Sequence, residues 1–265
     1  MKIVVITGST RGIGYGLADA FLDLDCAVTI SGRSQEAVDH AVAQLSAKHA
    51  AQRILGCPCN VREYQQVQAL WETAKAHFGQ IDIWVNNAGI GHSQVDSWEL
   101  SPEQLEAVVG TNVLGTMFGS KVAVQGMLAQ GFGAIYNMEG LGSRGGGPRV
   151  QGTSVYAASK AGLRYFDEML AQELRDTPLI LGTLNPGMVA TELVTSPYDD
   201  RPEEWERARR IFNIIADRVE TVAPWLARQM LDNQKNGVRI AWSSWWKVTS
   251  RFLAAPFRKR DLFDS

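Results

Sequence analysis

Residues 2–14 read KIVVITGSTRGIG, a short β-branched run followed by a loop that contains three glycines. The run at 2–6 predicts a strand buried on both faces, and the residues from Leu17 to Leu22 follow a helical period. Glycines between a strand and a helix let the backbone approach a phosphate, and the free N–H groups at the helix N-terminus favour an anion. The stretch therefore predicts a nucleotide-binding βα unit, with an ordinary βα turn as the alternative.

Strand and helix patterns alternate along the rest of the chain, without a linker or an internal repeat. Parallel strands need helical crossovers, which then cover both faces of the sheet. We expect one α/β domain over 1–265, a doubly wound Rossmann-type fold with a substrate lid at about 188–236 and an aromatic and basic tail at about 243–265. The seven strands of its parallel sheet are expected at 2–6, 27–31, 53–59, 81–85, 134–138, 179–184 and 238–242.

Composition excludes some classes of protein. The formal net charge is −2, which does not favour nucleic acid as a partner. The three cysteines, Cys26, Cys57 and Cys59, favour buried thiols in a reducing compartment over disulfides or a metal site. No signal or transit segment precedes the first strand and no apolar run is long enough to cross a bilayer, so we expect a cytoplasmic location.

The end of the second strand indicates which dinucleotide binds. An acidic residue about 20 residues after the glycines ordinarily bonds the adenosine ribose, but this strand ends in Gly32-Arg33-Ser34. Arg33 can instead hold a 2′-phosphate through a forked, charge-assisted contact, and Arg11 in the glycine loop can assist it. We therefore expect NADP(H) rather than NAD(H), with a solvated loop arginine as the alternative.

Tyr156 and Lys160 lie four residues apart in a run with helical period, so they share one helical face. A nearby cation favours the phenolate and lowers the pKa of a tyrosine, which makes the pair a candidate proton donor and acceptor. Two unrelated surface residues are the alternative. Motifs at 8–14, 86–89, 139–143 and 186–191 all follow expected strands, and this convergence at one edge of the sheet favours the catalytic interpretation.

Taken together, these motifs resemble the short-chain dehydrogenase/reductase family. The resemblance covers about residues 1–191 and rests on TGSTRGIG at 7–14, NNAG at 86–89, Asn112, YAASK at 156–160 and PGMVAT at 186–191. It implies a homo-oligomeric oxidoreductase that acts on CH–OH and C=O groups and binds a nicotinamide dinucleotide. The implied cofactor contacts are Gly8, Thr10, Arg11, Gly12, Ile13, Gly14, Arg33, Ser34, Asn60, Val61, Asn86, Ala88, Gly89, Pro186, Gly187 and Thr191.

The resemblance also implies catalytic roles. Tyr156 would protonate a carbonyl oxygen, Lys160 would bond the nicotinamide ribose and lower the pKa of Tyr156, and Asn112 would hold a water that passes protons through Lys160. The family's serine is displaced here: counting from the fifth strand gives Glu139 and Gly140, whereas counting back from Tyr156 gives Ser143. We expect Ser143 to be the catalytic serine, with Ser154 or no serine as alternatives. Glu139 is either a second acid or a solvated carboxylate.

Within the family, NMEGLGS at 137–143 and FNIIAD at 212–217 resemble the chlorophyll(ide) b reductases of the non-yellow-colouring type. This resemblance implies a role in chlorophyll catabolism, the NADPH-dependent reduction of a 7-formyl group to 7-hydroxymethyl. The alternatives are another carbonyl substrate of steroid, 3-oxoacyl or sugar type, and an NADP(H) sensor without turnover. Five late tryptophans either contact a large flat ligand or pack in the core: Trp205, Trp225, Trp242, Trp245 and Trp246.

Two regions suggest contacts beyond the substrate. Residues 245–257 place Trp245, Trp246, Phe252 and Leu253 on one helical face, and Arg258-Lys259-Arg260 follow. This tail is either an interfacial helix at a membrane or a tail packed on a subunit interface. By analogy with the family, the helices expected at 101–129 and 154–175 pair across a two-fold axis in a homo-dimer or homo-tetramer.

Overall fold

The computed structural model describes all residues except 144–149, 200, 256, 258–259 and 264–265. Part of the expected glycine-rich loop at 139–153, and Arg258 and Lys259 of the tail, therefore lie outside the described residues. The described strands are β1 (Ile3–Ile6), β2 (Ala27–Gly32), β3 (Ile54–Pro58), β4 (Ile83–Asn86), β5 (Gly133–Met138), β6 (Leu179–Asn185) and β7 (Val238–Ala241).

The strands form one seven-stranded sheet in the order β3-β2-β1-β4-β5-β6-β7, and every neighbouring pair is parallel. The doubly wound fold predicted from the sequence is thereby confirmed. The order reverses between β1 and β4, which is where ligands of such sheets bind. The fourth strand begins at Ile83 instead of Ile81, because the carboxylate of Asp82 accepts a hydrogen bond from the Ile3 amide at 2.8 Å and fixes the entry into the strand.

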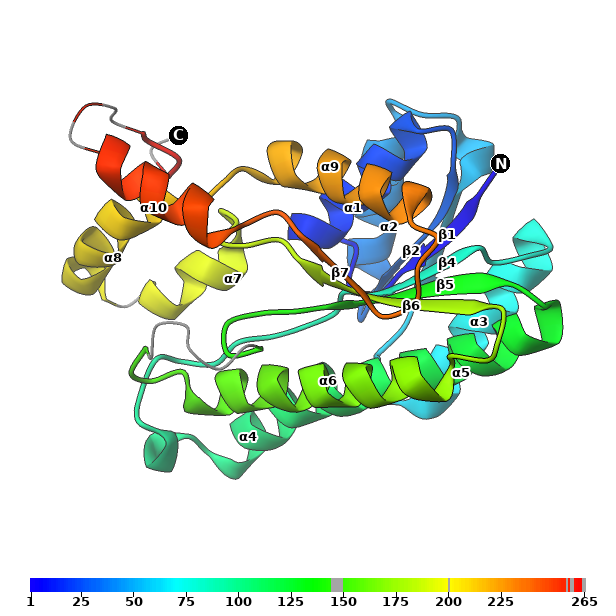
Figure 1. Cartoon of the computed structure of the whole chain (residues 1–265), viewed down its shortest axis with the longest axis horizontal. Helices are drawn as coiled ribbons and strands as arrows, with labels where there is room; N and C mark the ends of the chain where they lie inside the picture. The colour runs from blue at the N-terminus through cyan, green and yellow to red at the C-terminus, as the bar shows by residue number, and fades with distance from the viewer. Residues whose placement is uncertain (144–149, 200, 256, 258–259, 264–265) are drawn as a thin grey trace.

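Helices cover both faces of the sheet (Figure 1). One face carries α1 (Gly12–Asp23), α2 (Gln35–Ser46) and α9 (Val219–Asp232), and the other carries α3 (Tyr64–Phe78), α4 (Pro102–Val109), α5 (Gly115–Gln130) and α6 (Ser154–Glu173). Each face has its own apolar core, and the strand residues Ile6 and Trp84 are completely buried on opposite sides. Cys26, Cys57 and Cys59 are free and buried in these cores, as predicted.

The helices α7 (Glu192–Thr195), α8 (Pro202–Ile215) and α10 (Trp245–Ala254) group beyond one end of the sheet (Figure 1). Short 3₁₀ turns lie at Ala51–Arg53, Ser97–Glu99 and Ser196–Tyr198. The expected lid at 188–236 is divided by the structure, because α9 packs against α1 as part of the main helical layer. Of the expected lid, only α7 and α8 lie beyond the strand ends.

The helix expected at 101–129 is continuous from Pro102 to Gln130, but a π-helical turn, η3 (Gly110–Leu114), lies between α4 and α5. By length and composition alone this stretch passes as a membrane-spanning helix, which the sequence analysis did not foresee. Its most apolar window is 44% buried, and it packs against α3, α6, β4 and β5. This packing makes it a core helix of the domain.

Candidate active site

The predicted motifs converge at the carboxyl ends of β1, β4, β5 and β6. Three glycines show how near the motifs come to one another. A Cβ atom built on Gly8 would lie 2.8 Å from the Cα of Ala88, and one built on Gly12 would lie 3.6 Å from Cγ2 of Thr191. A Cβ on Gly140 would lie 2.4 Å from Oη of Tyr156. The convergence expected from the sequence is therefore present.

The glycine loop is held open by its own backbone conformation. Gly8 has a φ of 62° and Gly12 a φ of 58°, in the left-handed region that favours glycine. α1 begins at Gly12 with no side-chain cap from Arg11 and no acidic residue in its first turn. Its first N–H groups and the helix dipole are thus available to an anion, and the loop fits a pyrophosphate group.

Asn87 fixes this loop, and the sequence analysis did not name it as a site residue. Its Nδ2 donates to the carbonyl oxygens of Thr7 and Gly8, both at 2.9 Å. In return, the Thr7 hydroxyl oxygen accepts from the amides of Asn87 and Ala88 at 3.0 and 3.1 Å. The NNAG motif was the available signal, but its second asparagine was not assigned a role.

The end of β2 leaves one cation exposed. Arg33 is exposed and has no hydrogen bond or ion pair with any described residue. The Ser34 hydroxyl accepts from the Ala37 amide at 3.2 Å and so caps α2, and Thr10 packs on Gly32, where a Cβ would lie 2.6 Å from Cγ2 of Thr10. A 2′-phosphate contact by Arg33 stays a prediction.

Arg11 is directed elsewhere. Its guanidinium forms an ion pair with Glu192, the first residue of α7. The expectation that Arg11 assists at the 2′-phosphate is not met in this structure, because the carboxylate of Glu192 lies opposite it across the site. The members of this pair are 181 residues apart, so no local pattern predicts it.

The loop after β3 uses its side chains internally. The Asn60 Oδ1 accepts from the Arg62 amide at 3.2 Å, which stabilises the turn. Val61 is buried against α5, where a Cβ on Gly115 would lie 2.7 Å from Cγ2 of Val61. An adenine contact by these two residues stays a prediction, but the Val61 side chain is a core contact.

Asn86 is a structural residue of the sheet. Its Oδ1 accepts from the Trp84 indole at 2.8 Å, and its Nδ2 donates to Ser120 Oγ and to Asn137 Oδ1 at 3.1 and 2.8 Å. The side chain is buried and every polar atom in it has a partner. It supports the sheet, as expected, but it has no polar atom left to offer a ribose.

Asn112 lies completely buried in the π-helical turn η3. Its Oδ1 accepts from the Ile90 amide at 2.9 Å, while its Nδ2 donates to the Ile90 carbonyl at 3.0 Å and to Ser159 Oγ at 3.1 Å. A Cβ on Gly89 would lie 3.4 Å from Oδ1 of Asn112 and 3.7 Å from Nζ of Lys160. Asn112 thus fixes the loop after β4 against α6, beside the lysine. Such turns are frequent at functional sites.

Tyr156 and Lys160 point from α6 toward the end of β5. Lys160 is buried and its Nζ donates to the Met138 carbonyl at 3.0 Å. Burial lowers the pKa of Lys160 to about 8, although Asp167 and Glu139 act to raise it. Burial also raises the pKa of Tyr156 to about 12.

This last shift is opposite to the lowering that was expected from Lys160. The ammonium group binds the Met138 carbonyl, and burial of the phenol is the effect that sets the pKa of Tyr156. At neutral pH the phenol is therefore protonated, which is the form that can donate a proton.

Ser143 is 2% exposed and belongs to the turn that contacts Tyr156. Its Oγ accepts from the Gly140 amide at 2.9 Å, and Gly140 is the residue whose Cβ position faces the Tyr156 hydroxyl. Gly142 in the same turn has a φ of 93° and packs on Ala157 of α6. Ser154, the alternative serine, is exposed and lines a different cavity. The geometry favours Ser143.

Glu139 is neither a solvated carboxylate nor an acid facing a substrate, so both earlier interpretations are wrong. It is buried at the end of β5 and forms a two-oxygen contact with Nε of Arg239 on β7, at 2.8 and 2.9 Å. Thr183 and Asn185 of β6 each donate to it at 3.0 Å. Burial acts to raise its pKa, but these bonds from Arg239, Asn185 and Thr183 hold the pKa below its usual value.

The loop after β6 returns to the glycine loop. Gly187 has a φ of 71°, and a Cβ there would lie 2.8 Å from Cβ of Ser243. Thr191 stands at the N-terminus of α7 with its methyl group beside Gly12. The loop is tied at Val189, which forms a parallel bridge with Asp217.

Asp217 connects this loop to the C-terminal tail. Its carboxylate accepts from Arg251 at 2.7 and 2.8 Å, from Arg260 at 3.1 Å and from the Trp242 indole at 2.6 Å. Burial acts to raise the pKa of Asp217, but hydrogen bonds from Arg251 and Trp242 hold it below the usual value. No sequence motif predicts this connection.

Three of the five late tryptophans pack on other aromatic side chains. Trp225 and Trp242 meet edge to face with their ring centroids 5.4 Å apart, and Trp205 joins Tyr198, Phe212 and Phe263 in a cluster beside α8. Only Trp245 and Trp246 of this group are strongly exposed, at 76% and 79%. Trp205, Trp225 and Trp242 are half-buried, and each packs on aromatic neighbours.

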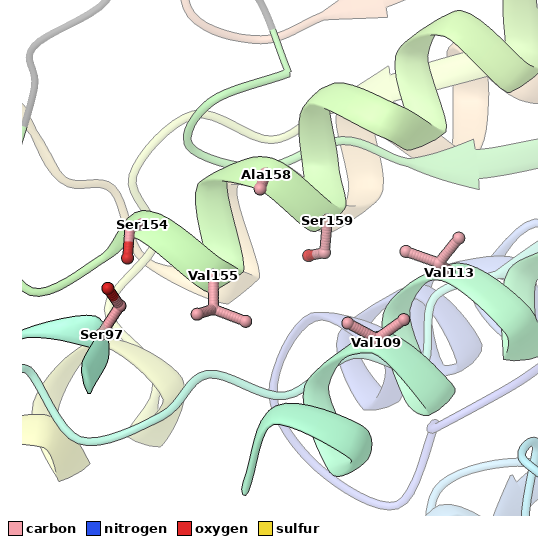
Figure 2. A pocket seen from close by; sticks show the side chains of 7 residues that line it. All are labelled: Ser97, Val109, Val113, Ser154, Val155, Ala158 and Ser159. Atoms are coloured by element: carbon pink, nitrogen blue, oxygen red, sulfur yellow. The ribbon is translucent and has the colours of Figure 1, made fainter. Parts of the chain in front are cut away.

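A pocket of about 460 Å³ lies between α4, η3 and the N-terminal half of α6 (Figure 2). It is lined by Ser97, Val109, Val113, Ser154, Val155, Ala158 and Ser159. None of the predicted catalytic residues lines it, although Ser159 of its lining accepts from Asn112. The pocket is therefore distinct from the site at the strand ends.

The amino-acid sequence of this chain is similar to those of known proteins. Residues 2–202 match the family model described as short chain dehydrogenase. A probable chlorophyll(ide) b reductase of Arabidopsis thaliana, described as chloroplastic, is 32% identical over 98% of this chain. The chain spans about half of that relative, 54% of its length.

Solved structures agree on the fold. An actinorhodin polyketide ketoreductase solved with NADPH is 25% identical, with a TM-score of 0.79 over 91% of this chain and 95% of that chain. A 3-ketoacyl-(acyl-carrier-protein) reductase from Brucella melitensis, complexed with NADH, is 24% identical, with a TM-score of 0.78 over 91% of this chain and 96% of that one.

Proposed function

The chain belongs to the short-chain dehydrogenase family, and we propose from that premise that it is an NADPH-dependent carbonyl reductase acting on the 7-formyl group of chlorophyll(ide) b. The observation that carries the reductase proposal is the placement of the Tyr156 hydroxyl against Gly140 at the strand ends, on the α6 face that also bears the buried Lys160. The choice of substrate is supported by the likeness over nearly the whole chain to a chlorophyll(ide) b reductase.

The choice of NADPH is supported by Arg33. Its exposed guanidinium has no partner among the described residues and follows a strand that ends without a carboxylate. An arginine in this place suits a 2′-phosphate, whereas the ribose hydroxyl of NAD(H) calls for an acidic acceptor. Gly8, Gly12 and the first turn of α1 would hold the pyrophosphate of the cofactor, which when bound would supply the hydride.

The chain's own residues then perform three tasks. Tyr156 donates its phenolic proton to the substrate oxygen as that oxygen gains negative charge. Ser143 orients the same oxygen through its hydroxyl hydrogen, because its Oγ already accepts from the Gly140 amide. Asn112 and the Met138 carbonyl hold the Ile90 loop and Lys160 in place around them.

Incubation with chlorophyllide b and NADPH, followed by absorption spectra, tests the substrate. We expect a shift from the formyl to the hydroxymethyl chromophore, and no shift with Tyr156→Phe. Turnover of other aldehydes or of 3-oxoacyl thioesters without chlorophyllide b would select another carbonyl substrate, as in the 3-ketoacyl reductase of the same fold. Binding of NADPH without turnover of any carbonyl would favour a sensor.

We also propose that the chain forms a homo-dimer through α4, α5 and α6. Val109, Leu114 and Leu128 on α4 to α5, and Tyr165 and Met169 on α6, are exposed apolar side chains. The pocket in Figure 2 lies along the same helices. Light scattering should give twice the chain mass for the wild type and the chain mass for Met169→Arg. A monomeric wild type would contradict the proposal.

Finally, we propose that α10 contacts a lipid surface. Trp245, Trp246 and Leu253 are 76%, 79% and 73% exposed, and Lys247 and Arg251 lie on the same helix. Lys247 and Arg251 both pair with Asp217, at 3.6 and 2.7 Å, so the exposed apolar side chains are the part of α10 that suits a bilayer surface. Co-sedimentation with phosphatidylglycerol vesicles should fall for Trp245→Ser combined with Trp246→Ser. Unchanged sedimentation, or dimer loss in that variant, would favour a subunit contact.

A further inference from the structure

Asp167 is a buried carboxylate on the catalytic face of α6. Tyr156, Lys160, Leu163 and Asp167 follow at steps of four, three and four residues, so they share the face turned toward the sheet. Asp167 is 5% exposed, and its Oδ1 accepts from Nδ2 of Asn137 at 2.6 Å. The mechanism described above does not use this group.

Asn137 connects the carboxylate to the sheet interior. Its Oδ1 accepts from Asn86 at 2.8 Å, and its Nδ2 also donates to Ser120 at 3.3 Å. Every contact in this network is an amide or a hydroxyl, so none of them supplies a positive charge to Asp167. A buried carboxylate without a cation is costly, and its charge must be balanced or it takes up a proton.

Three ionisable side chains meet at the end of β5. Glu139 is neutralised by Arg239, through contacts of 2.8 and 2.9 Å. Lys160 is 4% exposed and donates to a neutral carbonyl, and in the described part of the chain no arginine or lysine forms an ion pair with Asp167. Lys160 and Asp167, seven residues apart on one face of α6 and not in direct contact, are therefore the two buried charges left to balance each other through space.

The titration of the two groups agrees with this pairing. Burial raises the pKa of Asp167 to about 7; the Asn137 bond and Lys160 act to lower it, and Glu139 and Glu168 act to raise it. Burial lowers the pKa of Lys160 to about 8, and Asp167 is the largest opposing effect, followed by Glu139. Between these values each group is near its midpoint, so the charge of one depends on the charge of the other.

We propose that Asp167 is a positioning residue that keeps Lys160 protonated through their charge pairing inside the sheet–helix core, and so holds the ammonium at the Met138 carbonyl beside Tyr156. The carboxylate does not touch a substrate and acts through the lysine. The effect of Asp167 on catalysis rests on the proposed carbonyl reduction. The charge interaction between Asp167 and Lys160 can be tested without a substrate.

A double-mutant cycle on unfolding tests the pairing. Asp167→Asn keeps the acceptor for Asn137 and removes the charge, and Lys160→Met removes the ammonium. At pH 7.5 we expect the two shifts in unfolding midpoint to be non-additive, and at pH 5, where Asp167 is protonated, we expect them to add. Glu168→Gln, a surface carboxylate on the same helix, should be additive with Lys160→Met at both pH values. Additivity at pH 7.5, or equal non-additivity at both, would overturn the pairing.

A pH profile gives the second readout. Without Asp167 the pKa of Lys160 falls further, so the alkaline limb of kcat/KM should move to lower pH in Asp167→Asn, with a greater loss at pH 8 than at pH 6. A loss by the same factor at every pH would mean a merely structural role and would overturn positioning. If no carbonyl is reduced yet the unfolding cycle behaves as described, the proposed function fails and the pairing stands.

Discussion

Gly140 presents its α-carbon to the hydroxyl of Tyr156, and a Cβ atom at that position would lie only 2.4 Å from Oη. The same glycine donates its amide to Ser143 at 2.9 Å. The tyrosine hydroxyl and the serine are therefore placed relative to each other by one residue without a side chain. This relationship makes the turn after β5 the element that sets the catalytic geometry.

Gly140→Ala should displace the Tyr156 hydroxyl. A misplacement of about 1 Å in a catalytic group can cost about 100-fold in rate, so we expect kcat to fall by about that factor while the Kd for NADPH stays within a few-fold. Gly162→Ala is the matched control on α6, because a Cβ there meets no atom within 4 Å. Wild-type kcat in Gly140→Ala would contradict the contact.

Ser143→Ala removes the hydroxyl that bonds Gly140 and orients the substrate oxygen. Loss of one such donor costs about 10²- to 10³-fold in kcat, and we expect that loss with NADPH binding retained in fluorescence titration. Ser154→Ala should turn over normally, because Ser154 lines the separate pocket. The reverse pattern would make Ser154 the catalytic serine.

Arg33→Gln should change cofactor preference. A hydrogen-bonded charged contact contributes about 1.5–3 kcal/mol, so the Kd for NADPH should rise by about 10- to 100-fold while that for NADH changes little. Arg11→Gln should leave the NADPH to NADH ratio nearly unchanged, because the Arg11 guanidinium pairs with Glu192. Equal weakening of both cofactors by Arg33→Gln would argue against a 2′-phosphate contact.

Arg239→Met should leave the Glu139 carboxylate buried without its cation. Removing one partner of a buried pair costs about 3–5 kcal/mol, and we expect a loss of that order in urea unfolding at pH 7. In the wild type the pKa of Glu139 is lowered by its partners, so the pair stabilises the fold above the carboxyl's unfolded pKa and less as pH falls through the folded one. The variant can protonate Glu139 instead.

The difference between Arg239→Met and the wild type should therefore shrink from pH 7 to pH 4. A constant difference in the free energy of unfolding across that range would indicate that the variant loses packing contacts of Arg239 and not its charge. Arg164→Met is a suitable control, because its pair with Glu168 is on the surface and contributes little at either pH.

Residues close in sequence to a strand end could be placed from the sequence. Gly8, Asn112, Tyr156 and Lys160 belong to motifs whose spacing fixes their position, because parallel strands bring all their carboxyl ends to one edge. The position of Asp167 near the site also follows from the sequence, since it continues the α6 face of Tyr156 and Lys160. Its burial does not, because an acidic residue in a helix is ordinarily exposed to solvent.

Pairings between distant segments could not be predicted. Glu139 and Arg239 are 100 residues apart, and Arg11 and Glu192 are 181 apart, so no local pattern joins them. Burial raises the pKa of Tyr156, whereas a nearby ammonium group would lower it. Which effect is larger depends on the three-dimensional surroundings of the phenol, which no sequence pattern gives.

The arrangement at Asp217 has a practical consequence for anyone handling this protein. Its carboxylate is held by Arg251 and Arg260 near the C-terminus, and its backbone is bridged to Val189, two residues before Thr191 beside the glycine loop. A truncation that removes Arg251 or Arg260 would therefore also remove support from the loop that stands beside the glycine loop. Trp242, which donates to the same carboxylate at 2.6 Å, offers an intrinsic fluorophore for detecting such damage before any assay is run.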